Sequence, residues 1–304
     1  MKKNTGYYFV AVFVIFIWSI TFISTKVLLK NLNPIEIMFY RYVIAYLTLI
    51  IAYPKIHKSS GLREELLFIG AGLFGGTFYF LAENYALKFS LASNVGLLVT
   101  AAPLLTAIMA HIFMKEEKVN KRWYFGALIA FIGVFLVMFN GSFVLKLNPI
   151  GDFLAILAAF SWAVYSILIK VIGAKYNGIY ITRKIFFYSI LTMIPALLLT
   201  DFRWDNYILF NKSIVFNILF LGVLASSICF VLWNKVILHI GAVKSNNFIY
   251  LIPVVTMISS AIILNEAIKP ITVIGGILII FGVYVSENKN KYVVIEDVIK
   301  MENK

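Results

Sequence analysis

The chain has 304 residues, of which 62% are hydrophobic and 13% are charged, and its formal net charge is +13. Soluble domains are about 45–50% apolar and about 25% charged, so this composition excludes a water-soluble protein. The charge does not indicate a nucleic-acid-binding protein either. The 27 Lys and Arg are dispersed over the ends of apolar segments rather than gathered into one basic patch.

Ten continuous apolar blocks follow one another along the chain. They cover residues 7–27, 34–53, 66–87, 91–114, 123–139, 153–172, 181–199, 214–233, 248–264 and 271–285. A helix that crosses the bilayer needs about 20 residues, so ten helices use about 200 and leave about 100 for nine loops and two tails. Because the blocks do not alternate in polarity, they are not barrel strands. We therefore expect an all-α integral membrane protein with ten transmembrane helices.

The distribution of basic residues predicts the orientation. With the N-terminus placed in the cytosol, 19 Lys and Arg fall on the inner side and seven on the outer side, and Arg41 inside the second block is the last of the 27. This asymmetry predicts cytosolic termini in a multi-pass protein of the cell membrane. The first block follows Lys2 and Lys3 but has no small-residue cleavage pattern, so we interpret it as a retained helix rather than a signal peptide.

The second half of the chain repeats the first. Matching residues are 144 to 150 positions apart, in the pairs Trp18/Trp162, Asn84/Asn234, Pro103/Pro253, Glu116/Glu266, Gly126/Gly275 and Gly133/Gly282. Five helices per copy is an odd number, so the second copy must enter the membrane from the opposite face. The sequence predicts an inverted repeat of two five-helix units, residues 1–140 and 141–287, followed by a short cytosolic tail, 288–304.

The stretch 84–137 and its echo 234–285 carry a family resemblance. Both have an Asn before a helix ends, a helix that starts with small residues and contains a Pro, a Glu that closes this helix, and a Gly-rich last helix. In these features the chain resembles the paired EamA-type domains of the drug/metabolite transporter superfamily. The resemblance implies ten helices, a central cavity between the halves, and export of amino acids or other small metabolites.

Aromatic and amide residues fall on the first, third, fourth, sixth, eighth and ninth blocks, which the resemblance places around the cavity. They are Trp18, Tyr79, Asn84, Asn94, Trp162, Tyr165, Trp233, Asn234, Asn246, Asn247 and Tyr250. Aromatic walls with a few amide groups suit a zwitterionic or moderately apolar metabolite. Tyr and Trp also form interfacial belts, although Trp18 and Trp162 lie too near mid-span to fit that alternative well.

Three ionisable residues within the spans are further candidates. Glu83 is a carboxylate inside a span, and the repeat places Trp233 at the corresponding position. Glu83 could carry a proton or simply face water near the end of its helix, and His111 is a second candidate for proton coupling or an interfacial histidine. Arg41 either anchors its helix through an ion pair or the interface, or holds an anionic group.

Two pairs of matched residues suggest moving or clamping parts. Pro103 and Pro253 each remove a hydrogen bond from an apolar helix, which predicts a kink that either only packs or also gates the cavity. Glu116 and Glu266 each close a helix, where the helix dipole disfavours a carboxylate unless a basic group is near. We expect them to act as clamps at the helix ends.

Two alternatives to a transporter are an intramembrane enzyme and a structural or sensory membrane subunit. The sequence contains no HExxH, GxSxG or Walker A motif and no paired intramembrane Asp, so we expect no catalytic activity and no ATP-driven step. Cys229 is the only cysteine, which excludes an intramolecular disulfide and a cysteine-based zinc cluster. We expect a monomeric secondary transporter for a small-molecule solute in the lipid bilayer, without cofactor, metal or nucleic acid.

Overall fold

A computed structural model describes residues 5–55, 57, 61–90, 92–114, 121–139, 148–199, 211–255, 258 and 269–287. All secondary structure in these residues is helical. The first half contains α1 (Thr5–Leu28), α2 (Pro34–Ala52), α3 (Leu62–Gly72), η1 (Leu73–Phe78), α4 (Tyr79–Phe89), α5 (Ala92–Val99), α6 (Ala102–Phe113) and α7 (Lys121–Phe139). The second half contains α8 (Pro149–Ile172), α9 (Gly178–Leu198), α11 (Lys212–Leu219), η3 (Phe220–Ile228), α12 (Cys229–Ile240), α13 (Ala242–Asn247), η4 (Phe248–Leu251) and α15 (Pro270–Glu287).

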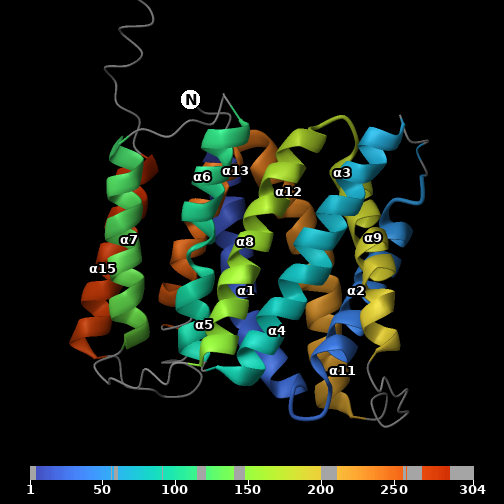
Figure 1. Ribbon diagram of the computed structural model, residues 1–304, viewed down its shortest axis with the longest axis horizontal. Coiled ribbons are helices and arrows are strands. Elements are labelled where there is room, and N and C mark those ends of the chain that lie inside the picture. Colours follow the sequence, from blue (N-terminus) through green and yellow to red (C-terminus); the bar gives the residue numbers. More distant parts are fainter. Residues whose placement is uncertain are drawn as a thin grey trace, which may run out of the picture.

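The helices form a bundle with roughly parallel axes (Figure 1). Seven helical segments of the described chain are long and apolar enough to cross a membrane, and α15 is a shorter apolar helix. Large apolar side chains face outward, for example Phe9 on α1, which is 73% exposed. An outward apolar face is what a bilayer requires, and the chain is therefore a multi-pass membrane protein.

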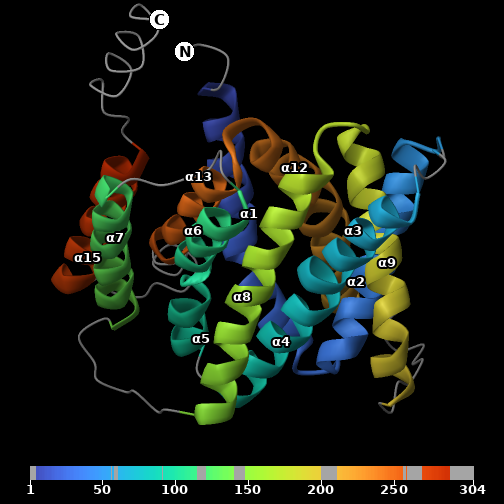
Figure 2. The ribbon, with the colours of Figure 1, turned by 45° about the horizontal axis from the view of Figure 1, so that its top comes forward.

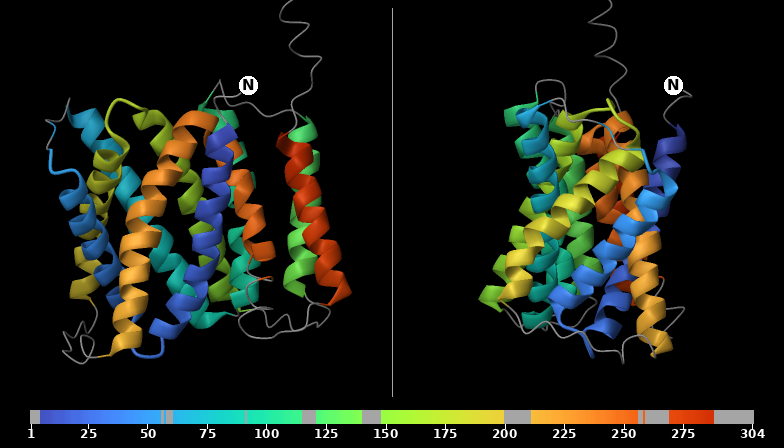
Figure 3. Two further views of the ribbon diagram at one scale, coloured as in Figure 1. Left: turned by 180° about the vertical axis from the view of Figure 1, so that it is seen from behind. Right: turned by 90° about the vertical axis from the view of Figure 1, so that its right-hand side faces the viewer.

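The two ends of the described chain lie at the same face of the bundle. Helix α1 begins and α15 ends there, as Figures 2 and 3 show from different sides. We call this face the amino-terminal face and the other the opposite face. Capping residues mark helix starts and helix ends at the two faces. Asn33 and Glu36 form a capping box at the start of α2, with Glu36 Oε2 accepting from the Asn33 amide at 2.7 Å. At the amino-terminal face, Gly173 and Gly241 end α8 and α12 with positive φ.

Polar contacts at the amino-terminal face tie α3 to the chain around the start of α9. Lys175 forms a 2.8 Å ion pair with Glu64, and Lys184 forms a 2.6 Å ion pair with Glu65. Hydrogen bonds to Glu64 and then to Tyr176 raise the pKa of Lys175. These contacts join residues from the two halves of the chain at this face.

A π-helical segment interrupts a long helix in each half, at matching positions. Segment η1 ends at Phe78 and η3 ends at Ile228, 150 residues later. A glycine just before η1, Gly72, and its match within η3, Gly222, each approach a helix of the other half. A Cβ on Gly72 would lie 2.9 Å from the Ile185 carbonyl oxygen, and one on Gly222 would lie 3.3 Å from the Arg41 carbonyl oxygen. Each long helix therefore packs against the other half through a glycine.

Helices α7 and α15 pack mainly on each other, in antiparallel directions (Figure 1). Their contact depends on four glycines. A Cβ on Gly126 would lie 2.6 Å from the Gly282 carbonyl oxygen, and a Cβ on Gly133 would lie 2.6 Å from the Gly275 carbonyl oxygen. Without these side chains, the backbones of the two helices can approach closely.

We predict that Gly72→Leu lowers the amount of folded protein in the membrane several-fold. Any Cβ at this position would lie 2.7 Å from Tyr188 Cβ, and overpacking of this kind costs about 1–3 kcal/mol. The matched control is Gly6→Leu, because a Cβ on Gly6 meets nothing within 4 Å. Fluorescence-detected size-exclusion chromatography would measure both variants, and equal yields would contradict the close packing.

Candidate functional site

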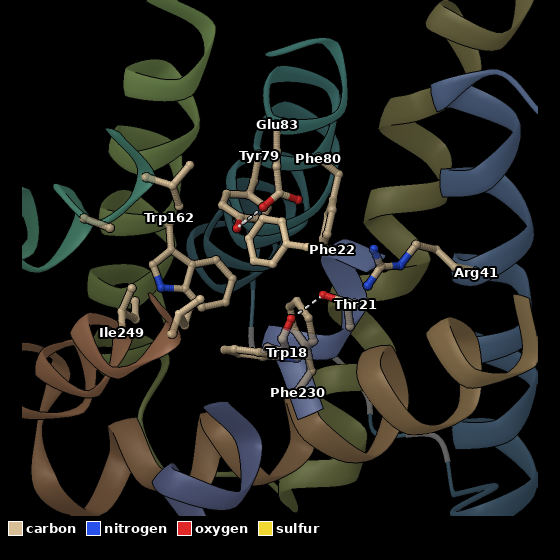
Figure 4. Close-up of a pocket in the computed structure, with 13 residues that line it drawn as sticks. Trp18, Thr21, Phe22, Arg41, Tyr79, Phe80, Glu83, Trp162, Phe230 and Ile249 are labelled. Atoms are coloured by element: carbon tan, nitrogen blue, oxygen red, sulfur yellow. Dashed lines mark hydrogen bonds between the residues drawn. The ribbon is translucent and has the colours of Figure 1, made fainter. Parts of the chain in front are cut away.

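A cavity lies near the middle of the bundle, between helices of both halves (Figure 4). It holds about 540 Å³ of space free of atoms, part of which is open to solvent. The lining residues come from α1, α2, α4, α5, α6, α8, α12 and from η4 and the residue after it. They are Trp18, Thr21, Phe22, Arg41, Tyr79, Phe80, Glu83, Val99, Ala102, Trp162, Phe230, Ile249 and Ile252.

Six of the thirteen residues that line the cavity are aromatic. Trp18 and Trp162, which occupy matching positions of the repeat, meet edge to face with ring centroids 5.3 Å apart. Tyr79 contacts the Trp162 ring at 5.1 Å and the Phe80 ring at 4.8 Å. Such arrangements satisfy the preferred geometry of aromatic pairs and give a stiff apolar wall.

Two charged side chains interrupt this apolar wall. Arg41 on α2 is 4% exposed, donates from Nε to Ser226 Oγ at 2.9 Å, and lies over the Phe80 ring at 4.1 Å. Glu83 on α4 is 8% exposed and accepts a 2.8 Å hydrogen bond from the Tyr79 hydroxyl at Oε1. Among the described contacts no ion pair joins Arg41 to Glu83. Figure 4 shows the two side chains on different sides of the cavity.

A hydrogen-bonded cluster, which we call the amide seal, lies next to the cavity, toward the amino-terminal face. Trp162 Nε1 donates to Asn246 Oδ1 at 2.9 Å, and Asn246 Nδ2 donates to Ser166 Oγ at 3.0 Å. The Tyr165 hydroxyl donates to Asn234 Oδ1 at 2.6 Å, and Asn234 Nδ2 donates to Thr182 Oγ1 at 3.0 Å. These bonds connect α8, α9, α12 and α13. The chain directions of α8 and α12 place them on the amino-terminal side of the cavity.

The other predicted cavity residues are buried outside the lining. Trp233 is 0% exposed and packs on Trp18 with ring centroids 5.0 Å apart. Asn247 Nδ2 donates to Ser286 Oγ at 2.9 Å, Asn84 Nδ2 donates to the Pro34 carbonyl at 3.5 Å, and Tyr250 is fully buried. The structure thus brings Trp18, Tyr79, Trp162 and Glu83 together around one space, and it places most of the amides in the surrounding packing.

Both predicted proline kinks coincide with irregular backbone. Helix α5 ends at Val99 and α6 begins at Ala102, so Pro103 stands in the first turn of α6. Pro253 follows the 3-10 segment η4, again where a helix changes character. A proline in a first turn loses no intrahelical bond, so the break lies just before each proline rather than at it. A gating role for these breaks stays a prediction.

Several predicted residues lie elsewhere or outside the described part. His111 is exposed near the end of α6. Glu116, Glu266 and the side chain of Asn94 lie outside the described residues. The sequence argument did not select Thr21, Phe22 or Phe80 for the cavity. The first two follow Trp18 by three and four residues on one helix face, a spacing that could have identified them.

The fold and cavity are those of a multi-pass membrane transporter. A model of the EamA-like transporter family matches residues 5–139 and again residues 149–287, and the chain therefore belongs to this family. This match confirms the resemblance seen in 84–137 and 234–285, and it shows an architecture of two repeats.

Relatives and a solved structure agree with this assignment. An uncharacterized transporter of Archaeoglobus fulgidus is 30% identical over 90% of this chain and 94% of its own. A probable amino-acid metabolite efflux pump of Salmonella typhimurium is 24% identical over 94% of this chain and 95% of its own, and one of Escherichia coli matches to the same extent. A crystal structure matches with a TM-score of 0.74 at 19% identity, over 94% of this chain and 98% of the other, which shows the common fold.

We predict that Asn234→Ala destabilises the protein by about 1–2 kcal/mol, because it strands the buried Tyr165 hydroxyl. The matching Asn84→Ala should cost less, since the bond from Asn84 Nδ2 to the Pro34 carbonyl is long at 3.5 Å. Thermal unfolding of both variants in detergent would measure the difference. Equal midpoints would show that the amide seal adds nothing to stability.

Proposed function

We propose that the protein is a secondary transporter that exports a small zwitterionic metabolite, an amino acid or a related compound, across the cytoplasmic membrane by alternating access. The observation that carries the proposal is the cavity itself. One basic and one acidic side chain, Arg41 and Glu83, lie near the middle of the bundle in a wall that otherwise consists mainly of aromatic and aliphatic side chains. A charge inside a membrane bundle is costly, so its presence at a cavity points to a function.

Paired contacts support an inverted repeat as the basis of alternating access. Gly72 faces Ile185 and Gly222 faces Arg41, so the partners are exchanged between halves at offsets of 150 and 144 residues. The same exchange relates the contact of Gly126 with Gly282 to that of Gly275 with Gly133. Such reciprocity is what a two-fold axis between residues 1–140 and 141–287 would produce, and secondary transporters use inverted repeats in this way.

The proposed transporter has ten spans and cytosolic termini. Seven described segments have the length and composition of spans. Helices α7 and α15 and the segment formed by α13 and η4 would bring the number to ten. An even number fits the start of α1 and the end of α15 at one face, as in Figure 3. The bias of Lys and Arg supports a cytosolic amino-terminal face, and the cavity would then lie on the outer side of the amide seal.

The chemistry of the cavity favours a zwitterion with an apolar part. The Arg41 guanidinium uses Nε for Ser226, which leaves its terminal nitrogens for a carboxylate. The Glu83 carboxylate keeps Oε2 for an ammonium group after Oε1 accepts from Tyr79. The rings of Trp18, Trp162 and Phe230 offer contact to an apolar side chain. The names of the Salmonella and Escherichia relatives agree with this class of solute.

We expect transport by purified protein in liposomes to depend on both charges of the solute. L-phenylalanine should be transported better than phenethylamine, which lacks the carboxylate, and better than phenylpropionate, which lacks the ammonium group. Arg41→Gln should lower L-phenylalanine transport about tenfold but change phenethylamine transport little, because it removes only the carboxylate partner. Uptake of the three radiolabelled probes measures this, extended to other amino acids to cover side-chain size.

Lys212→Gln is the matched control for loss of a positive charge, since Lys212 is exposed at the start of α11 and away from the cavity. If Arg41→Gln and the control transported all probes equally, the cavity would not be the site of recognition. Absence of transport for the whole panel in the unaltered protein would overturn the proposed class of solute.

Reporter fusions test the orientation. Green fluorescent protein fused after Lys304 should fluoresce, and alkaline phosphatase fused there should be inactive. Both results are expected of a cytosolic C-terminus, which the bias of basic residues predicts. Alkaline phosphatase and green fluorescent protein fusions give opposite signals and serve as controls for each other. Phosphatase activity at this position would contradict either the even number of crossings or the orientation.

A further inference from the structure

The two halves differ sharply at one position next to the cavity. Asn84 and Asn234 are matching positions of the repeat, so the positions just before them also correspond. The first half has Glu83 there and the second half has Trp233. Trp233 is fully buried on the amino-terminal side of the cavity, beside the amide seal. Glu83 lines the cavity itself. An acidic side chain thus takes the place of a large apolar one.

Trp233 shows what this position requires when its side of the bundle is closed. The side chain is 0% exposed, and its ring packs on Trp18 at 5.0 Å and on Trp162 at 6.4 Å. Because Trp18 and Trp162 are themselves a matched pair, exchange of the two halves would bring Glu83 against the same two rings. In an inverted repeat, this exchange is the transport step.

Glu83 cannot enter such a place as an unpaired anion. An ionised carboxylate that loses water needs a proton or a cation as partner, because burial of an uncompensated charge is strongly unfavourable. The ionisable groups that interact with it are Tyr79 on α4 and Arg41 and Tyr42 on α2, and η1 and the described side chains of α5 bring none. On α8, Tyr165 lies near Tyr42 and donates its hydroxyl to Asn234. Arg41 is held by Ser226 and Phe80 on another side of the cavity.

We propose that Glu83 binds in turn the ammonium group of the solute and a proton, and that the outer side closes only when one of them is bound. The proposal rests on the function proposed above and adds its energy coupling. The solute leaves with Glu83 ionised. A proton from the outer solution then binds the carboxylate, returns with it, and is released to the cytosol. Each cycle exports one zwitterion and imports one proton with its positive charge, so both the pH gradient and the membrane potential drive export.

Closure without any solute gives a direct test. In a Cys229→Ala background, a cysteine at Thr21, which lines the cavity, is labelled with a membrane-impermeant maleimide in proteoliposomes. The rates are normalised to a cysteine at the exposed Lys30, which corrects for the reactivity of the thiol itself. Between about pH 8 and about pH 5.5 the normalised rate should fall about fivefold, because protons shift the population toward the closed state.

Variants of Glu83 identify the responsible group. Glu83→Gln should label slowly at every pH, because a neutral amide closes without a proton, and Glu83→Asp should keep the pH response. A response that persists in Glu83→Gln would assign it to another group, such as His111, and would overturn the proposal. A flat profile in the parent with full labelling at low pH would also overturn it.

A transport measurement separates this proposal from the proposed function. Vesicles loaded with L-phenylalanine and the pH dye pyranine should acidify inside as the solute leaves, and a potassium–valinomycin clamp that makes the interior negative should speed efflux. Efflux without acidification would overturn proton coupling and leave the transporter standing. Absence of efflux, with a normal pH response of the Thr21 cysteine, would overturn the choice of solute alone.

Discussion

The arrangement of this protein depends on one constraint: a polar group within the hydrocarbon region must find a partner inside the bundle. Arg41 meets it with Ser226, Glu83 with Tyr79, and the buried amides with hydroxyls and the Trp162 indole. All of these groups therefore face inward. The outer surface is left to side chains such as Phe9, which the lipid can cover. The positions of the cavity and of the amide seal both follow from this sorting.

The same constraint divides the interior into two functional parts. Around Asn234 and Asn246, the amides meet hydroxyls and the Trp162 indole, and both polar atoms of each amide are used. Where charged groups meet aromatic rings, bonding capacity remains on Arg41 and Glu83, and space remains beside it. Under the proposed function, a solute that brings its own charges completes these groups. The part of the interior around the cavity would then select the ligand, whereas the amide seal holds helices together.

The sequence predicted the helices and the duplication well because both depend on local composition and spacing. The matched glycines of α7 and α15 and the pair Trp18/Trp162 lie where a repeat would put them. The sequence could not predict which polar side chains would have their hydrogen-bonding groups paired within the protein. Tyr165 and Asn234 are 69 residues apart, and Arg41 and Ser226 are 185 apart, so their pairing depends on the tertiary packing. Amides expected at the cavity, such as Asn246, are instead in the seal for this reason.

A repeat that were perfectly symmetric would give both sides of the membrane the same closing surface. Here the two surfaces differ, with Trp233 on one side and Glu83 on the other, and with Tyr165 matched at an offset of 144 residues by Thr21. The side that carries Trp233, Tyr165 and Asn234 closes through its own dry packing and hydrogen bonds. The side that carries Glu83 has an acidic group in place of Trp233, and under the proposed coupling a proton or the solute supplies its partner. In this proposal, the departures from symmetry, more than the symmetry itself, determine which ion can drive the export of the solute.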